Sequence, residues 1–311
     1  MHLFSPLSIG PLRLPNRIVC SALASGHSTY EGGAAPALVN YYAARALGGA
    51  GSVVIEACWP LQPAVRAAHL GLYDDDFIPG LRVAIERIHH AGAYAIVLID
   101  QPLDIAQMAD AELEQISRAW IAAAQRASQA GADGIMLSCA DGGPFHQLLS
   151  PLSNRRAGVF GGTLEHRTRL LLGTAERIHA RFGGHMLLGL RLLADEFTPG
   201  GVSMQDARVV ARRLTGAGVN LVEVFALAGG ASPMALFPGW RTPLSSAIRA
   251  VVDVPVMVGD LNDDPVFANS VLVERSADLL ALGEVLRADP IWPQRARATL
   301  GLQPHQERLH R

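Results

Sequence analysis

Short apolar runs alternate with longer amphipathic segments along the whole chain. Eight of these runs are almost continuously apolar, a pattern typical of strands that are covered on both faces. We predict strands at residues 18–23, 52–57, 93–99, 134–139, 186–193, 221–227, 255–259 and 279–283. Helical periodicity predicts helices at residues 37–47, 77–91, 111–130, 164–182, 203–217, 243–252, 265–274 and 290–300.

Eight strand–helix units in succession predict one α/β domain over residues 1–311, a single (β/α)8 TIM barrel. A β-hairpin near residues 3–13 is expected to close the base of this barrel. A doubly wound sheet is the competing arrangement, but no GxGxxG motif follows the first predicted strand. In a barrel, the chemistry lies at the carboxyl ends of the strands, so candidate residues are sought there.

Composition excludes several classes of protein. The 26 basic side chains are all arginine, so an enzyme that needs a lysine ammonium, such as a Schiff-base aldolase or a P-loop nucleotidase, is excluded. A net charge of -2 does not suggest a nucleic-acid partner. Three cysteines indicate no disulfide framework, and the histidines show no metal-ligand spacing. No apolar run reaches membrane-spanning length and no signal peptide is visible, so we expect a soluble cytoplasmic protein.

Several short motifs resemble one known family. The chain contains SPLSNR at 150–155 and FGGTLEHR at 160–167, with LFSPL at 3–7, PNRIV at 15–19, VIEA at 54–57 and ADLLALG at 277–283. Their order and spacing resemble the old yellow enzyme family of FMN-dependent oxidoreductases over nearly the whole chain. The resemblance implies a TIM barrel that uses FMN and NAD(P)H and acts on a small unsaturated carbonyl compound.

The positions that match the family's flavin and substrate contacts are altered. Ala22 and Leu23 replace the family's Pro-Met pair, which lies against the flavin. Leu98 replaces a glutamine that hydrogen-bonds the flavin pyrimidine ring. Ser138 and Asp141 occupy the positions of two side chains that hold the substrate oxygen, and Gly143 that of a tyrosine. The resemblance therefore predicts a remodelled pocket.

The phosphate end is altered in charge. Gly259 and Gly283 match the glycines that cradle the FMN phosphate, but Asp260 and Glu284 follow them, with Glu284 at the position of an arginine. A carboxylate there reverses the sign of the interaction with a phosphate dianion. If FMN is retained, the resemblance implies that it is held by Ala57, Arg191, Gly259 and Gly283.

Three functions follow from these observations. Our main prediction is an enzyme with weakened or lost FMN binding that performs non-redox proton transfer on a carbonyl compound, giving isomerisation, dehydration or cyclisation. The alternative is an FMN-dependent NAD(P)H oxidoreductase, or ene-reductase, with altered flavin contacts. The third is an inactive barrel that serves as a binding subunit.

The candidate catalytic residues are polar groups near the predicted strand ends. An acid or imidazole beside an arginine suits proton abstraction next to a carbonyl, with the arginine stabilising the enolate. The candidates are Arg191, Asp141, Ser138, His146 and Asp100. Each has a structural alternative; Arg191, for example, is also expected as a buried arginine paired with Asp195 or Glu223.

Other residues are expected to line the pocket without reacting. These are Ala22, His27, Leu98, Gln101 and Trp240. The segment around Trp240 resembles a family loop, which places this side chain either at the pocket mouth or in a contact between subunits of a homo-oligomer.

Overall fold

A closed ring of parallel strands forms the centre of the protein. The computed structural model describes residues 2–65, 67–226 and 237–302. Neighbouring strands in the ring follow the order of the sequence, and the last pairs with the first. The ring in this part of the chain comprises β3 (Ile18–Cys20), β4 (Ser52–Trp59), β6 (Tyr94–Ile99), β7 (Gly134–Cys139), β8 (Leu187–Leu193), β9 (Leu221–Phe225), β10 (Val256–Val258) and β11 (Leu279–Ala281). The predicted barrel is confirmed; residue 227 of one predicted strand lies outside the described residues.

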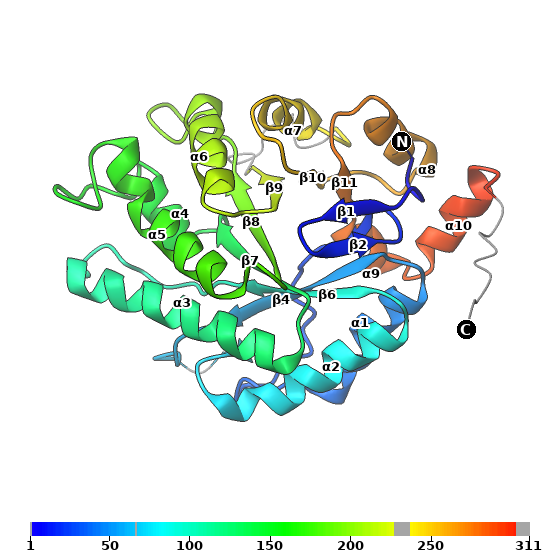
Figure 1. Ribbon diagram of the computed structural model, residues 1–311, viewed down its shortest axis with the longest axis horizontal. Helices are drawn as coiled ribbons and strands as arrows, with labels where there is room; N and C mark the ends of the chain where they lie inside the picture. The colour runs from blue at the N-terminus through cyan, green and yellow to red at the C-terminus, as the bar shows by residue number, and fades with distance from the viewer. Residues whose placement is uncertain (1, 66, 227–236, 303–311) are drawn as a thin grey trace.

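Helices surround the strands (Figure 1). The eight predicted helices are present as α1 (Pro36–Leu47), α2 (Ile78–His90), α3 (Asp110–Ala130), α5 (Leu164–Phe182), α6 (Met204–Gly216), α7 (Thr242–Arg249), α8 (Pro265–Val273) and α10 (Trp292–Thr299). Short elements that the periodicity did not indicate are η1 (Asp75–Phe77), β5 (Leu70–Gly71), α4 (Pro144–Leu149) and α9 (Gly283–Ala288). Among the described residues, no helix is long and apolar enough to cross a lipid bilayer.

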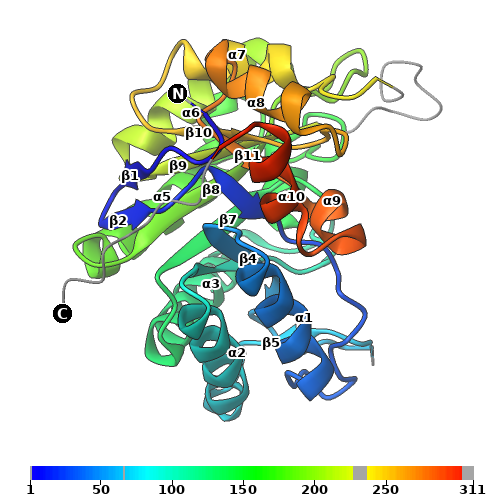
Figure 2. The ribbon, with the colours of Figure 1, turned by 90° about the vertical axis from the view of Figure 1, so that its right-hand side faces the viewer.

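The N-terminal hairpin closes one end of the barrel (Figure 2). It consists of β1 (Leu7–Ile9) and β2 (Leu12–Leu14), which pair antiparallel. Ile9, Leu12 and Leu14 belong to the same buried cluster as inward-facing residues near the strand starts, such as Leu187 and Leu221. Because this end is filled by apolar side chains, the opposite, carboxyl end is the one left to form a site, as predicted.

Candidate active site

A cavity of about 850 Å³ lies at the carboxyl ends of the strands. All eight strands of the ring, or the residues that directly follow them, contribute to its lining. Its volume falls in the range of pockets that hold a cofactor or small molecule. The predicted site residues that line it are Ala22, Ala57, Leu98, Asp100, Gln101, Asp141, Arg191, Trp240, Gly259 and Gly283.

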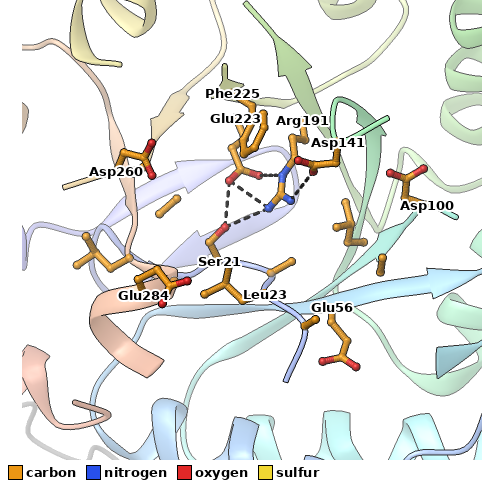
Figure 3. Close-up of a pocket in the computed structure, with 18 of the residues that line it drawn as sticks. Ser21, Leu23, Glu56, Asp100, Asp141, Arg191, Glu223, Phe225, Asp260 and Glu284 are labelled. Carbon is orange, nitrogen blue, oxygen red and sulfur yellow. Dashed lines mark hydrogen bonds and ion pairs between the residues drawn. The ribbon is translucent and has the colours of Figure 1, made fainter. Parts of the chain in front are cut away.

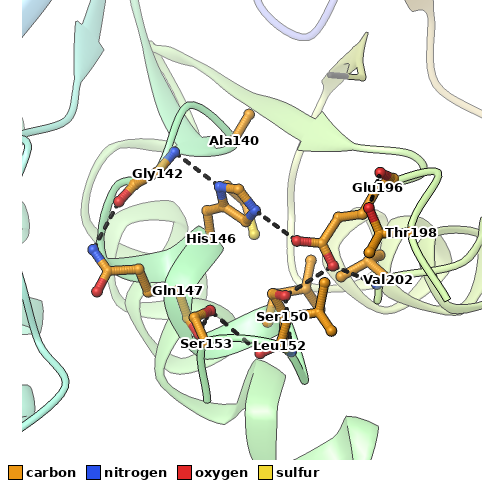
Figure 4. A network of polar contacts seen from close by, with 12 residues as sticks. Ala140, Gly142, His146, Gln147, Ser150, Leu152, Ser153, Glu196, Thr198 and Val202 are labelled. Carbon is orange, nitrogen blue, oxygen red and sulfur yellow. Dashed lines mark hydrogen bonds and ion pairs between the residues drawn. The ribbon is translucent and has the colours of Figure 1, made fainter. Parts of the chain in front are cut away.

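His146 lies outside this cavity, in contrast to its predicted catalytic place. It sits on α4, where its Nδ1 accepts a hydrogen bond from Gly142 N at 2.8 Å and its Nε2 lies 3.3 Å from Glu196 Oε1 (Figure 4). Glu196 also accepts hydrogen bonds from Ser150 Oγ and Val202 N. The imidazole therefore ties the loops after β7 and β8 together and does not face a substrate.

Two further candidates are also absent from the cavity wall. Ser138 is completely buried and interacts with the Asp100 carboxylate and with Ala140, so its hydroxyl is not presented to a ligand. His27 is exposed on the loop after β3 and packs edge-on against Tyr41, with ring centroids 5.9 Å apart. Strand-end position alone was not sufficient to place these side chains in the cavity.

Arg191 is the centre of a buried polar network (Figure 3). Its Nε and Nη2 donate to Glu223 at 2.8 and 3.3 Å, its Nη2 also to Ser21 Oγ at 3.1 Å, and its Nη1 to Asp141 at 3.2 Å. Ser21 Oγ in turn donates to Glu223 at 3.0 Å. Burial lowers the pKa of Arg191, but the charges of Glu223 and Asp141 outweigh it and raise the pKa above the ordinary value. The guanidinium is therefore a fixed cation, and the structural pairing with Glu223 is confirmed.

Asp100 is a buried acid that directly follows β6. It is 6 % exposed and its Oδ1 accepts a hydrogen bond from Gln101 N at 2.9 Å. Burial raises the pKa of this carboxyl to about 7, against the lowering effects of Ser138 and Gln101. A side chain at Gly143 would overlap Asp100 Oδ1, so a glycine at this position makes room for the acid. Asp100 is thus able to hold or release a proton near neutral pH.

The carboxylates expected at the phosphate end are both paired with arginines. Asp260 Oδ2 lies 3.0 Å from Arg241 Nη2, and Glu284 lies 2.5 Å from Arg287 Nη2. Arg241 lines the cavity and is only 9 % exposed. Arg191 was the only arginine among the predicted site residues, so Arg241 was missed. Both carboxylates line the cavity, as expected, but each has an arginine partner. The only sequence signal for Arg241 was that it follows the pocket residue Trp240.

Aromatic side chains form another part of the cavity lining. Trp59 and His69 both line it and stack on each other, with ring centroids 4.5 Å apart. Phe225 and Trp240 line another part of the wall, and both rings contact the Arg241 guanidinium. The described residues hold no group of three or more His, Cys, Asp or Glu side chains arranged to bind a metal ion. The cavity therefore combines planar apolar faces, two buried arginines and three buried acids, Glu56, Asp100 and Glu223.

The barrel, its cofactor-sized cavity and the sequence motifs together indicate one family of TIM-barrel enzymes. The model of the NADH:flavin oxidoreductase / NADH oxidase family matches residues 2–101 and 100–303. The chain is 32% identical to an NADH oxidase of Thermoanaerobacter brockii, covering 95% of this chain and 50% of that protein. It is 31% identical to an NADPH dehydrogenase of Halalkalibacterium halodurans, covering 96% of this chain and 95% of that protein.

Comparison of solved structures agrees on the fold. The old yellow enzyme homologue from Zymomonas mobilis superposes with a TM-score of 0.82 at 19% identity, covering 97% of this chain and 94% of that one. The chain spans half the length of the T. brockii protein but nearly all of the H. halodurans protein. This chain belongs to the NADH:flavin oxidoreductase / NADH oxidase family, as the old yellow enzyme motifs predicted.

Proposed function

We propose that this protein is an FMN-dependent oxidoreductase that takes electrons from NAD(P)H and passes them to a small carbonyl compound. The observation that carries the proposal is the convergence of the four predicted cofactor positions. Ala57, Arg191, Gly259 and Gly283 come from four different strand ends, yet all line the same cavity. Because these four residues line one cavity, the flavin-dependent alternative is favoured over our main prediction from sequence.

The charges of the cavity fit a flavin nucleotide better than the sequence implied. Each carboxylate at the expected phosphate end has an arginine partner, so this end carries paired rather than uncompensated negative charge. Arg241 also has a buried Nε with no hydrogen-bond partner among the described residues, so the protein does not use its full hydrogen-bonding capacity. Gly259 and Gly283, which have no side chains, leave their backbone open to the cavity that they line.

The protein's own side chains have separate tasks in this proposal. Bound FMN would supply the hydride-transfer chemistry. Arg191, held by Glu223 and Ser21, would stabilise negative charge beside it, because a fixed buried cation acts without reorganising. Asp100 would hold a proton for the substrate, and the Trp59–His69 stack would shield the reacting groups from water.

A second candidate function is proton transfer without flavin. One observation favours it: Asp100, whose pKa is raised by burial to about 7, lines the same cavity as Arg191. The comparisons lend no support to it, since the relatives carry the names NADH oxidase and NADPH dehydrogenase. They give the inactive-barrel alternative no support either. We therefore rank the oxidoreductase first.

One experiment separates these functions. The purified protein, supplemented with FMN and freed of excess, is expected to show a stoichiometric flavin spectrum and to be bleached anaerobically by NADH or NADPH. Addition of an unsaturated carbonyl compound should restore the oxidised spectrum. A matched control, Arg118→Gln at an exposed position of α3, should behave as wild type. Protein that binds no FMN but exchanges the α-protons of a ketone would refute the first proposal and favour the second.

A further inference from the structure

Arg241 is an unusual feature of the cavity, because it is a buried cation supplied by a segment outside the barrel strands. It immediately precedes α7 and is 9 % exposed. Its Nη2 donates to Ala226 O at 2.6 Å and lies 3.0 Å from Asp260 Oδ2. The guanidinium carbon lies 4.1 Å from the ring centroid of Phe225 and 5.0 Å from that of Trp240. These contacts fix the group in one orientation.

Its hydrogen-bonding capacity is not used up by the protein. Arg241 Nε is buried and has no partner among the described residues. A buried donor left without an acceptor is costly. Arg17, Arg45 and Arg208 also have a buried Nε without a partner among the described residues, but of these four arginines only Arg241 lines the cavity. Arg191, in contrast, has its Nε and both terminal nitrogens engaged by Glu223, Ser21 and Asp141. Arg241 is therefore the better candidate to bind an anion.

The segment that carries Arg241 is tied to the end of β10. Gly239 N donates to Asp260 O at 2.7 Å, and Trp240 Nε1 donates to Asp260 Oδ2 at 2.8 Å. Asp260 directly follows Gly259, one of the two glycines of the expected phosphate end. Asp260 and Glu284 lie on one side of Arg191 and Asp100 lies on the other (Figure 3). Arg241 is thus at the end of the cavity opposite Asp100.

We propose that Arg241 binds the phosphate group of FMN and that Asp260 positions it. This inference rests on the proposed function. It assigns the contact with the FMN phosphate to a residue outside the segments of Gly259 and Gly283. A guanidinium forms paired, charge-assisted hydrogen bonds to a phosphate, and this chain has no lysine to do so. Asp260 and Glu284, which follow the two glycines, are both acidic and line the cavity, so the cation comes instead from the segment before α7.

Asp260 has two opposing effects in this arrangement. Its carboxylate holds Arg241 and Trp240 in place, but its negative charge also repels a phosphate nearby. The residue has φ of 59°, in the left-handed region that asparagine tolerates well. The substitution Asp260→Asn therefore removes the charge while retaining a hydrogen-bond acceptor and the backbone conformation.

The test compares two flavins that differ only in the phosphate group. Flavin-free protein is titrated with FMN and with riboflavin, and quenching of the flavin fluorescence gives each dissociation constant. Arg241→Gln should weaken FMN binding at least ~10-fold and leave riboflavin binding nearly unchanged, the effect expected for loss of a charge-assisted contact. Arg241→Lys should recover part of the loss. The surface control Arg118→Gln should match wild type.

Asp260→Asn should act in the opposite direction, strengthening FMN binding relative to riboflavin. This variant keeps the proposal testable if Arg241→Gln fails to fold. Wild-type preference for FMN that persists in Arg241→Gln would overturn the assignment while leaving the proposed function intact. Equal loss of FMN and riboflavin in that variant would also overturn it, because a merely structural role predicts this pattern. Wild-type protein that binds neither flavin would refute the proposed function itself.

Discussion

Asp100→Asn is expected to change the pH dependence of stability. Burial raises the pKa of Asp100 from 3.8 to about 7 in the folded protein. Below about pH 4 the carboxyl is protonated in both the folded and the unfolded state, so it adds no pH-dependent term. Between about pH 4 and 7 the unfolded chain releases the proton while the folded state retains it, and stability falls as pH rises. Above about pH 7 the full cost of ionising a buried acid is present.

The size of this effect follows from the difference in pKa. About three pH units at ~1.36 kcal/mol each correspond to roughly 4 kcal/mol across the whole window. Asparagine has nearly the same shape, cannot ionise, and its oxygen can accept the same hydrogen bond from Gln101 N. The unfolding free energy of Asp100→Asn should therefore rise by up to ~4 kcal/mol relative to that of wild type on going from acid to alkaline pH. More than half of this rise should fall between pH 5 and 8.

Urea unfolding at several pH values between 5 and 8 measures this gain. Asp104→Asn, which changes an exposed carboxylate on the same loop, is the matched control and should leave the pH dependence as in wild type. Unfolding free energies of wild type and Asp100→Asn that run parallel over this range would show that Asp100 has an ordinary pKa. The proton-holding role assigned to it would then fail as well.

Two further predictions concern the buried polar and thiol groups. Glu223→Gln should lower the unfolding free energy by about 3 kcal/mol, because it removes the charge that compensates buried Arg191; a loss below ~1 kcal/mol in urea unfolding would contradict this. Cys20, Cys58 and Cys139 are all buried, and desolvation raises the pKa of Cys20 to about 12. Folded protein should thus react slowly with a thiol reagent at pH 8 and expose three thiols in urea, whereas rapid native labelling would count against the packing described.

The strand order and the helices that cover the barrel were predictable from local pattern. Parallel strands buried on both faces are nearly continuous in apolar residues, so all eight stood out, and the long helices showed their amphipathic period. The helices α4 and α9 were missed because six residues hold fewer than two turns, too few to establish a period. Element type in this fold is largely a local property.

Site residues on or directly beside the strands were predicted better than residues in the loops. Leu98 and Arg191 line the cavity because a side chain on a barrel strand points either inward or outward, and alternation fixes which. His146 follows β7 by several residues, and α4 turns it toward Glu196 instead. The direction of a loop side chain depends on which other loop packs against it, which no local pattern encodes.

By itself, the sequence determined the barrel, the family and the fact that arginine must supply every fixed positive side-chain charge. Only the tertiary structure decided which carboxylate each arginine meets. Arg191 pairs with Glu223 and Arg241 with Asp260, residues that are distant in sequence and about 3 Å apart in space. Ion pairing varies over ångströms, and those distances are set by closure of the ring and by loop packing. The charge balance of the cavity is therefore a property of the fold.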